Sequence, residues 1–117
     1  MTYGGRALGV RFVDSRLYEA YAELANGTRE DKALRNSIEK AIQKLKENPV
    51  CGKRIQSGLW PKEYVRRYGI NNLWKCNLLG GWRLVYTVVG DKVEIISVLL
   101  EWMSHKEYER RFGYKPG

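Results

Sequence analysis

The sequence has little of several residue types on which other classes of protein depend. Among its 117 residues there are only two cysteines, Cys51 and Cys76, and one histidine, His105. The cysteines lack CxxC spacing and have no histidine nearby, so neither a zinc site nor a disulfide framework is indicated. Reduced thiols in the cytoplasm fit this pattern better, and no metal or other cofactor is expected.

Long apolar runs are also missing. No stretch approaches the roughly 18 apolar residues of a membrane span. The first ten residues, MTYGGRALGV, lack the apolar middle of a signal peptide. With 44% hydrophobic residues the chain can bury one core, and its length favours one domain over residues 1–117. We expect residues 1–8 and 113–117 to be flexible ends and the protein to be cytoplasmic.

Acidic residues are scarce relative to basic ones. The chain has 21 Lys and Arg against 13 Asp and Glu, a net charge of +8. Residues 52–83 contain seven basic residues and one acidic residue, a net charge of +6 for that segment. Such a concentration suggests an anionic partner, either nucleic acid or an acidic protein. The alternative is a cationic surface that serves solubility alone.

The first half of the chain predicts a strand and a pair of helices. An apolar run over residues 9–13 predicts the strand, and Asp14 or Ser15 then caps a helix. We expect this helix to end at Asn26 and Gly27, because glycine accepts the left-handed cap conformation.

The second helix is predicted to begin after Thr28 and to end near Asn48, because Pro49 disfavours a helical conformation in the residue before it. The short link between the two helices predicts an antiparallel hairpin. Apolar residues recur along the second helix at the spacing of one buried face: Leu34, Ile38, Ala41, Ile42 and Leu45.

After residue 50 the pattern becomes strand-like. Residues 82–89 (WRLVYTVV) and 92–100 (KVEIISVLL) predict a hairpin that turns at Gly90–Asp91. Shorter strands are predicted at EYVRRYG, 63–69, and NNLWKCNLL, 71–79. The segment 104–112 (SHKEYERRF) predicts a short helix capped by Ser104.

These elements predict an α+β fold. An N-terminal strand, an antiparallel helical hairpin on one face of an antiparallel sheet of four to five strands, and a short C-terminal helix account for the whole pattern. Strand alternation places Arg83, Lys75 and Asn77 on the sheet face opposite the helical hairpin. We expect that face to be uncovered and cationic.

The run GGWRLVYTVVGDKVEIISV followed by SHKEYERRF resembles the core of the RelE/ParE superfamily of toxins from type II toxin–antitoxin modules. The resemblance covers roughly residues 9–112 and implies a RelE-like fold. It also implies two alternative activities. RelE-like members cleave messenger RNA on the ribosome without a metal, whereas ParE-like members inhibit DNA gyrase and are not known as nucleases.

The resemblance implies roles for strand residues. Arg83 matches the strand arginine that contacts the scissile phosphate in RelE-like nucleases, and a guanidinium suits this role because it binds two phosphate oxygens at once. Lys75 and Asn77 match two positions that are both lysine in the best-known members. Asn77 therefore departs from the pattern by the loss of one cation.

His105 and Tyr108 are the remaining catalytic candidates. His105 is the side chain that exchanges protons near neutral pH without a perturbed pKa, and Tyr108 follows one helical turn later. SHKEYER resembles the THKEYD-like ending of the HigB branch. In several ribonuclease branches of the superfamily a histidine or tyrosine near this end acts as acid, base or stacking group. The alternative is that both are structural. The arginine that other members carry before this helix is replaced here by residues 101–103, Glu-Trp-Met.

Four further basic residues, together with Asn77, are candidates for positioning RNA through its phosphates: Lys53, Arg54, Arg66 and Arg67. If residues 63–69 form a strand, only one of Arg66 and Arg67 faces the RNA.

The sequence therefore leaves three hypotheses. The first is a toxin that cleaves messenger RNA on the ribosome through the ribose 2′-OH and so inhibits translation. The second is a gyrase inhibitor without nuclease activity, and the third is a catalytically impaired module that binds RNA or an antitoxin. The implied partners are an acidic antitoxin that covers the basic face in a hetero-oligomer, messenger RNA and the ribosome, with no membrane.

Overall fold

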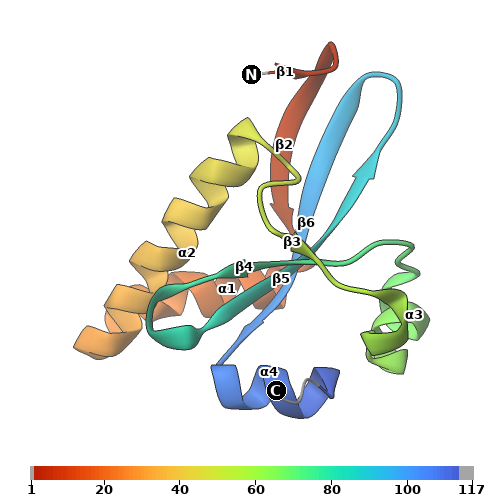
Figure 1. The fold of residues 1–117 in the computed structure, drawn as a ribbon. Coiled ribbons are helices and arrows are strands. Elements are labelled where there is room, and N and C mark those ends of the chain that lie inside the picture. The colour runs from red at the N-terminus through yellow and green to blue at the C-terminus, as the bar shows by residue number, and fades with distance from the viewer. Residues whose placement is uncertain (1, 114–117) are drawn as a thin grey trace.

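The computed structural model of the protein describes residues 2–113 (Figure 1). Its helices are α1 (Ser15–Glu23), α2 (Arg29–Glu47), α3 (Lys62–Tyr68) and α4 (His105–Phe112). Its strands are β1 (Thr2–Tyr3), β2 (Arg6–Phe12), β3 (Lys53–Arg54), β4 (Trp74–Asn77), β5 (Arg83–Gly90) and β6 (Glu94–Met103). Within this part of the chain, no helix has the length and apolar character needed to cross a membrane.

The strands form one mixed sheet in the order β1-β2-β6-β5-β4-β3. The predicted α+β class, N-terminal strand, helical pair and short C-terminal helix are confirmed. One pairing is parallel, because β2 joins the sheet beside β6, with Ala7 opposite Glu94 and Phe12 opposite Leu99. Every other pair of neighbouring strands is antiparallel.

The helical pair covers one face of the sheet, as predicted. Thr28 caps α2 and exchanges hydrogen bonds with Asp31 in a capping box. The buried residues of α2 are the predicted apolar face: Leu34, Ile38, Ala41, Ile42 and Leu45. They form the first apolar cluster with the sheet residues Leu84, Tyr86 and Leu99.

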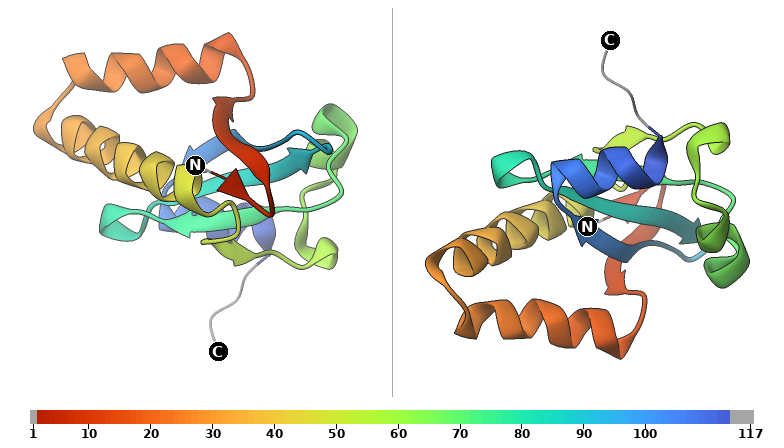
Figure 2. Two further views of the ribbon diagram at one scale, coloured as in Figure 1. Left: turned by 90° about the horizontal axis from the view of Figure 1, so that it is seen from above. Right: turned by 90° about the horizontal axis from the view of Figure 1, so that it is seen from below.

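The opposite face is not uncovered, and this part of the prediction is wrong. Helices α3 and α4 lie on that side of the sheet, away from α1 and α2 (Figure 2). They enclose a second apolar cluster, formed by Ile55, Tyr64, Ile70, Leu73, Val85, Leu100, Met103, Tyr108 and Phe112. Basic residues therefore border a second core, because apolar strand residues on this face also have to be buried.

Residues 62–68 form a helix where a strand was predicted over residues 63–69. α3 runs from Lys62 to Tyr68 and ends at Gly69, which has the left-handed conformation with φ of 60°. Tyr64 and Tyr68, one turn apart, bring their rings to 5.9 Å between centroids, and Tyr64 is buried. Seven residues were too few for helical spacing to be distinguished from strand alternation.

Two turns differ from the prediction. Gly27 has φ of −91°, so it does not provide a left-handed cap. Glycine is needed there because a Cβ would lie 2.2 Å from Oδ2 of Asp31. The β5–β6 hairpin turns at residues 91–94 rather than at Gly90–Asp91, because the Asp91 carboxylate accepts hydrogen bonds from the backbone N–H groups of Val93 and Glu94.

The two chain ends differ from each other. Thr2–Tyr3 and Arg6 onward lie in β1 and β2, so most of the N-terminal segment expected to be flexible forms the edge of the sheet. Gly113 follows α4 in the left-handed conformation, and residues 114–117 lie outside the described residues.

Tyr86 connects the sheet to the loop after α2. Its hydroxyl donates a hydrogen bond to the Pro49 carbonyl at 3.0 Å and accepts one from the Gly52 N–H at 3.1 Å. Position 52 requires glycine, because a Cβ there would lie 2.5 Å from the Lys75 carbonyl oxygen. The hydroxyl thereby fixes the segment that leads into β3.

We expect Tyr86→Phe to lower the free energy of unfolding by about 1–3 kcal/mol, because a buried N–H and a carbonyl lose their partner. Urea denaturation measures this loss. Tyr18→Phe is the matched control, since Tyr18 is 55% exposed. An equal effect of the two substitutions would contradict the role assigned to the Tyr86 hydroxyl.

Candidate nucleic-acid interface

Arg83 lies at the start of β5, and only Trp82 separates it from the Gly80–Gly81 turn. Its Nη1 donates to the carbonyl oxygens of Gly81 and Trp82. The Nε–H is buried and, among the described residues, has no hydrogen-bond partner. Because buried donors are normally paired, an arginine with a vacant donor is suited to an anionic ligand.

His105 begins α4 and lies against the same turn. Its Nδ1 is 3.2 Å from Nη2 of Arg83, and its Nε2 contacts the Glu109 carboxylate. A guanidinium only donates, so Nδ1 accepts and the proton of the neutral ring is on Nε2. A Cβ on Gly81 would be 3.3 Å from Cβ of His105, so the glycine turn allows this close approach. Arg83 and His105, 22 residues apart in sequence, therefore form one unit.

Tyr108 is buried beneath two cations. Its side chain is 2% exposed, and its ring stacks on Phe112 at 4.6 Å between centroids. The Lys75 ammonium lies 4.8 Å from the centre of the Tyr108 ring and the Arg83 guanidinium 5.6 Å from it. The ring face stabilises both cations, so the Tyr108 ring lies beneath Lys75 and Arg83 and supports them.

Lys75 is half-buried in β4. Burial lowers the pKa of its ammonium, and the charges of Arg83 and Lys53 lower it further. A lysine in such surroundings gives up its proton more readily than an exposed one. Of the two cations that lie over the Tyr108 ring, Lys75 is therefore better suited than Arg83 to donate a proton.

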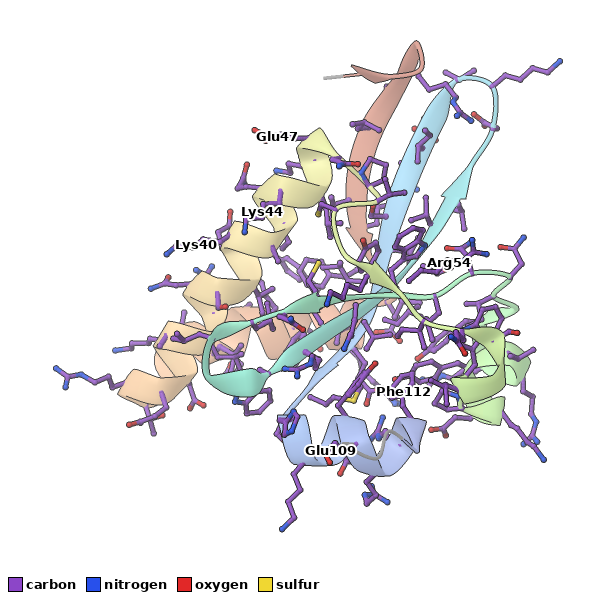
Figure 3. The ribbon with its side chains drawn as sticks, in the orientation of Figure 1. Lys40, Lys44, Glu47, Arg54, Glu109 and Phe112 are labelled. Carbon is purple, nitrogen blue, oxygen red and sulfur yellow. The ribbon has the colours of Figure 1, made fainter. Side chains whose placement is uncertain are left out.

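Lys53 and Arg54 lie next to these residues, on the edge strand β3 of the sheet. β3 pairs with β4 so that Lys53 lies opposite Lys75. A cavity of about 190 Å³ is lined by Lys53, Arg54, Gln56, Lys75 and Tyr108, among others. Arg54 is labelled on this edge in Figure 3. Asn77 is exposed and lies opposite Arg83 in the β4–β5 register.

We name Lys53, Lys75, Arg83, His105 and Tyr108 the cationic cluster. The structure brings these five predicted residues together from β3, β4, β5 and α4.

Arg66 and Arg67 lie elsewhere, on α3. The Arg67 guanidinium stacks on the Tyr68 ring, 5.4 Å from its centre. Arg67 also lines a separate cavity of about 370 Å³ between α1 and α3, together with Asp14, Arg16 and Arg111. Because α3 is a helix, strand alternation cannot decide which of the two faces a ligand.

Sequence reasoning missed two acidic residues near the candidates. Glu109 follows His105 by four positions, the spacing of neighbours on a helix, and that signal was available. Glu101 accepts hydrogen bonds from the Tyr64 hydroxyl and from Arg111, and it occupies the stretch where an arginine was missing. Within residues 2–113, no group of three or more His, Cys, Asp or Glu side chains is arranged to hold a metal ion.

Glu107 forms ion pairs with two arginines of the same helix, α4. Arg110 and Arg111 both donate hydrogen bonds to its carboxylate. These bonds, with that from Arg110 the stronger cause, lower the pKa of the Glu107 carboxyl from 4.5 to about 2. A carboxyl with a depressed pKa in the folded state stabilises the fold above its ordinary pKa. This contribution is lost as the pH falls from 4.5 towards 2.

We therefore expect Glu107→Gln to lower Tm near neutral pH and the difference from wild type to shrink as the pH falls towards 2. Thermal unfolding followed by circular dichroism over this pH range measures it. Glu19→Gln, an exposed substitution on α1, is the control. A difference that stays constant from neutral to acid pH would show that the Glu107 charge contributes nothing.

Comparison with known protein families identifies the class of protein. Residues 14–101, more than half of the chain, match the family described as ParE toxin of type II toxin-antitoxin system, parDE. The chain belongs to this family, within the RelE/ParE superfamily of toxins. Neither the comparison with curated proteins nor that with solved structures gives a match. Membership implies a cognate antitoxin as partner.

Proposed function

We propose that this toxin is an endoribonuclease that cleaves messenger RNA on the ribosome and thereby inhibits translation. The observation that carries the proposal is the contact of Arg83 with His105 beside Lys75. In this proposal Arg83 is the phosphate-binding group, His105 the proton acceptor and Lys75 the proton donor. Cleavage through the ribose 2′-OH needs these three groups and no metal.

Arg83 binds the scissile phosphate in this proposal. Its Nη2 group, which contacts His105 in the structure, stabilises the charge that develops on the phosphate oxygens, while Nη1 stays on the Gly81 and Trp82 carbonyls and holds the guanidinium in place. When Nη2 turns to the phosphate, it releases Nδ1 of His105. Substrate binding thereby frees the lone pair that a base requires.

His105 then accepts the proton of the 2′-OH at Nδ1, and the 2′-oxygen attacks phosphorus. The Glu109 carboxylate at Nε2 stabilises the imidazolium that forms and holds the ring in position. Lys75 donates a proton to the 5′-oxygen as its bond to phosphorus breaks. The products are a 2′,3′-cyclic phosphate and a 5′-hydroxyl end.

RNA binding extends from the cationic cluster along the β3 edge. Lys53 and Arg54 bind neighbouring phosphates, and Asn77 supplies a polar contact beside Arg83. Arg66 and Arg67 contribute on α3, where they contact RNA or ribosome farther from the cleaved bond. The same basic surface binds an acidic antitoxin in a hetero-oligomer in the cytoplasm, and that partner excludes RNA.

The second candidate function is inhibition of DNA gyrase without cleavage. The description of the matched family as ParE toxin favours it. Asn77, which replaces a cation beside Arg83, favours a third and weaker alternative, a module that binds RNA or an antitoxin without cutting.

Two assays on the purified protein distinguish these functions. We expect inhibition of cell-free protein synthesis and no effect on plasmid supercoiling by gyrase. Inhibition of supercoiling with undisturbed translation would favour the second function. An inactive protein that still binds its antitoxin would favour the third.

A further inference from the structure

The two cysteines, separated by 24 residues in the sequence, meet in the fold. Cys51 and Cys76 line one cavity of about 190 Å³, together with Gly52 and Lys75. The strand pairing brings the two segments together, because Lys53 lies opposite Lys75 in the antiparallel β3–β4 pair. Cys51 and Gly52 precede β3 and lie outside the regular strand, so strand alternation does not fix the side to which Cys51 points, and the shared cavity places it beside Cys76.

The backbone is held in this arrangement from both sides. Gly52 approaches the Lys75 carbonyl so closely that a Cβ would lie 2.5 Å from it, and the Gly52 N–H donates to Tyr86. The segment that carries Cys51 therefore cannot drift from β4 without breaking these contacts.

The two thiols differ in accessibility. Cys51 is exposed, whereas Cys76 is half-buried. Burial, followed by interaction with Cys51, raises the pKa of the Cys76 thiol to about 12. The exposed Cys51 thiol therefore meets an oxidant first, and Cys76 lies next to it to resolve the product, in a step that its raised pKa slows.

We propose that Cys51 and Cys76 form a site of reversible oxidation that closes to an intramolecular disulfide. The oxidant is hydrogen peroxide. The Cys51 sulfur attacks one peroxide oxygen, the O–O bond breaks, and Cys51 sulfenic acid and water are produced. The Cys76 sulfur then attacks the sulfenic sulfur, its proton leaves with the hydroxyl as a second water, and the S–S bond forms.

The disulfide would fasten the segment that carries Lys53 to the strand that carries Lys75. Both lysines belong to the cationic cluster, so oxidation stiffens the part of the sheet edge that bears it. The inference does not depend on the reaction proposed above, because it rests on the cavity that the two thiols share and on the backbone contacts around them.

The test is oxidation of the purified, reduced full-length protein with hydrogen peroxide, followed by alkylation of the remaining thiols and intact-mass measurement. We expect both thiols to become unreactive together, with a mass lower by about 2 Da and a monomer on a non-reducing gel. A dithiol reductant should restore both thiols. Thiols that remain alkylatable, or only intermolecular dimers, would overturn the proposal.

A shifted cysteine is the matched control. The double variant Cys51→Ser, Val50→Cys moves the exposed thiol by one residue, and we expect its disulfide to form at least about tenfold more slowly. Equal rates would show that the folded geometry does not select the pair. The wild-type disulfide should also raise Tm by on the order of 10 °C, and a lower Tm would contradict its fit to the native fold.

Discussion

Replacing Arg83 by alanine is expected to lower the rate of messenger-RNA cleavage by about 100- to 1,000-fold, the usual loss when one preorganised donor to a developing anion is removed. The substitution removes the phosphate-binding group and also the contact that orients His105. Single-turnover cleavage in ribosome complexes measures the rate directly.

Two variants serve as controls, one for the charge of Arg83 and one for the loss of an arginine elsewhere on the surface. Arg83→Lys keeps the charge but loses the planar fork, so we expect it to recover only part of the activity. Arg29→Ala removes an exposed arginine in the first turn of α2 and should leave the rate unchanged. Full activity of a well-folded Arg83→Ala protein would exclude the proposed role of Arg83.

Replacing Phe112 by alanine is expected to lower the free energy of unfolding by about 3–5 kcal/mol. Phe112 is 2% exposed, stacks on Tyr108 and meets the Tyr64 ring edge-on at 5.9 Å. It anchors α4, on which it is labelled in Figure 3, to the second apolar cluster. Cleavage should fall as well, because α4 carries His105 and Tyr108.

Urea denaturation measures the stability loss, and hydrogen exchange of the α4 amides shows whether the helix detaches locally. Phe112→Leu is the control for volume, since it keeps an apolar side chain and should lose much less stability. If Phe112→Ala unfolds at the same urea concentration as the wild type, α4 does not depend on this anchor.

Much of the fold could be predicted because the relevant information is local. The apolar face of α2 repeats at helical spacing over 19 residues, long enough to identify the element and its buried side. Alternation in β4 and β5 predicted that Lys75 and Arg83 share a face, and the Tyr108 ring contacts both.

Other features depend on tertiary contacts that no local pattern reports. α3 is short and its sequence suits either a helix or a strand, so its packing through Tyr64 decides. The second apolar cluster draws its members from six separate segments of the chain, and the meeting of Cys51 with Cys76 depends on the β3–β4 register. The parallel β2–β6 pair likewise joins strands about 80 residues apart.

The most direct test of the proposed nuclease is mapping of messenger-RNA 5′ ends in a cell-free translation reaction with the wild-type protein, with Arg83→Ala and with His105→Ala. We expect new 5′-hydroxyl ends that require ribosomes, vanish with Arg83→Ala and become scarce with His105→Ala. The absence of new ends with folded wild-type protein would contradict the account.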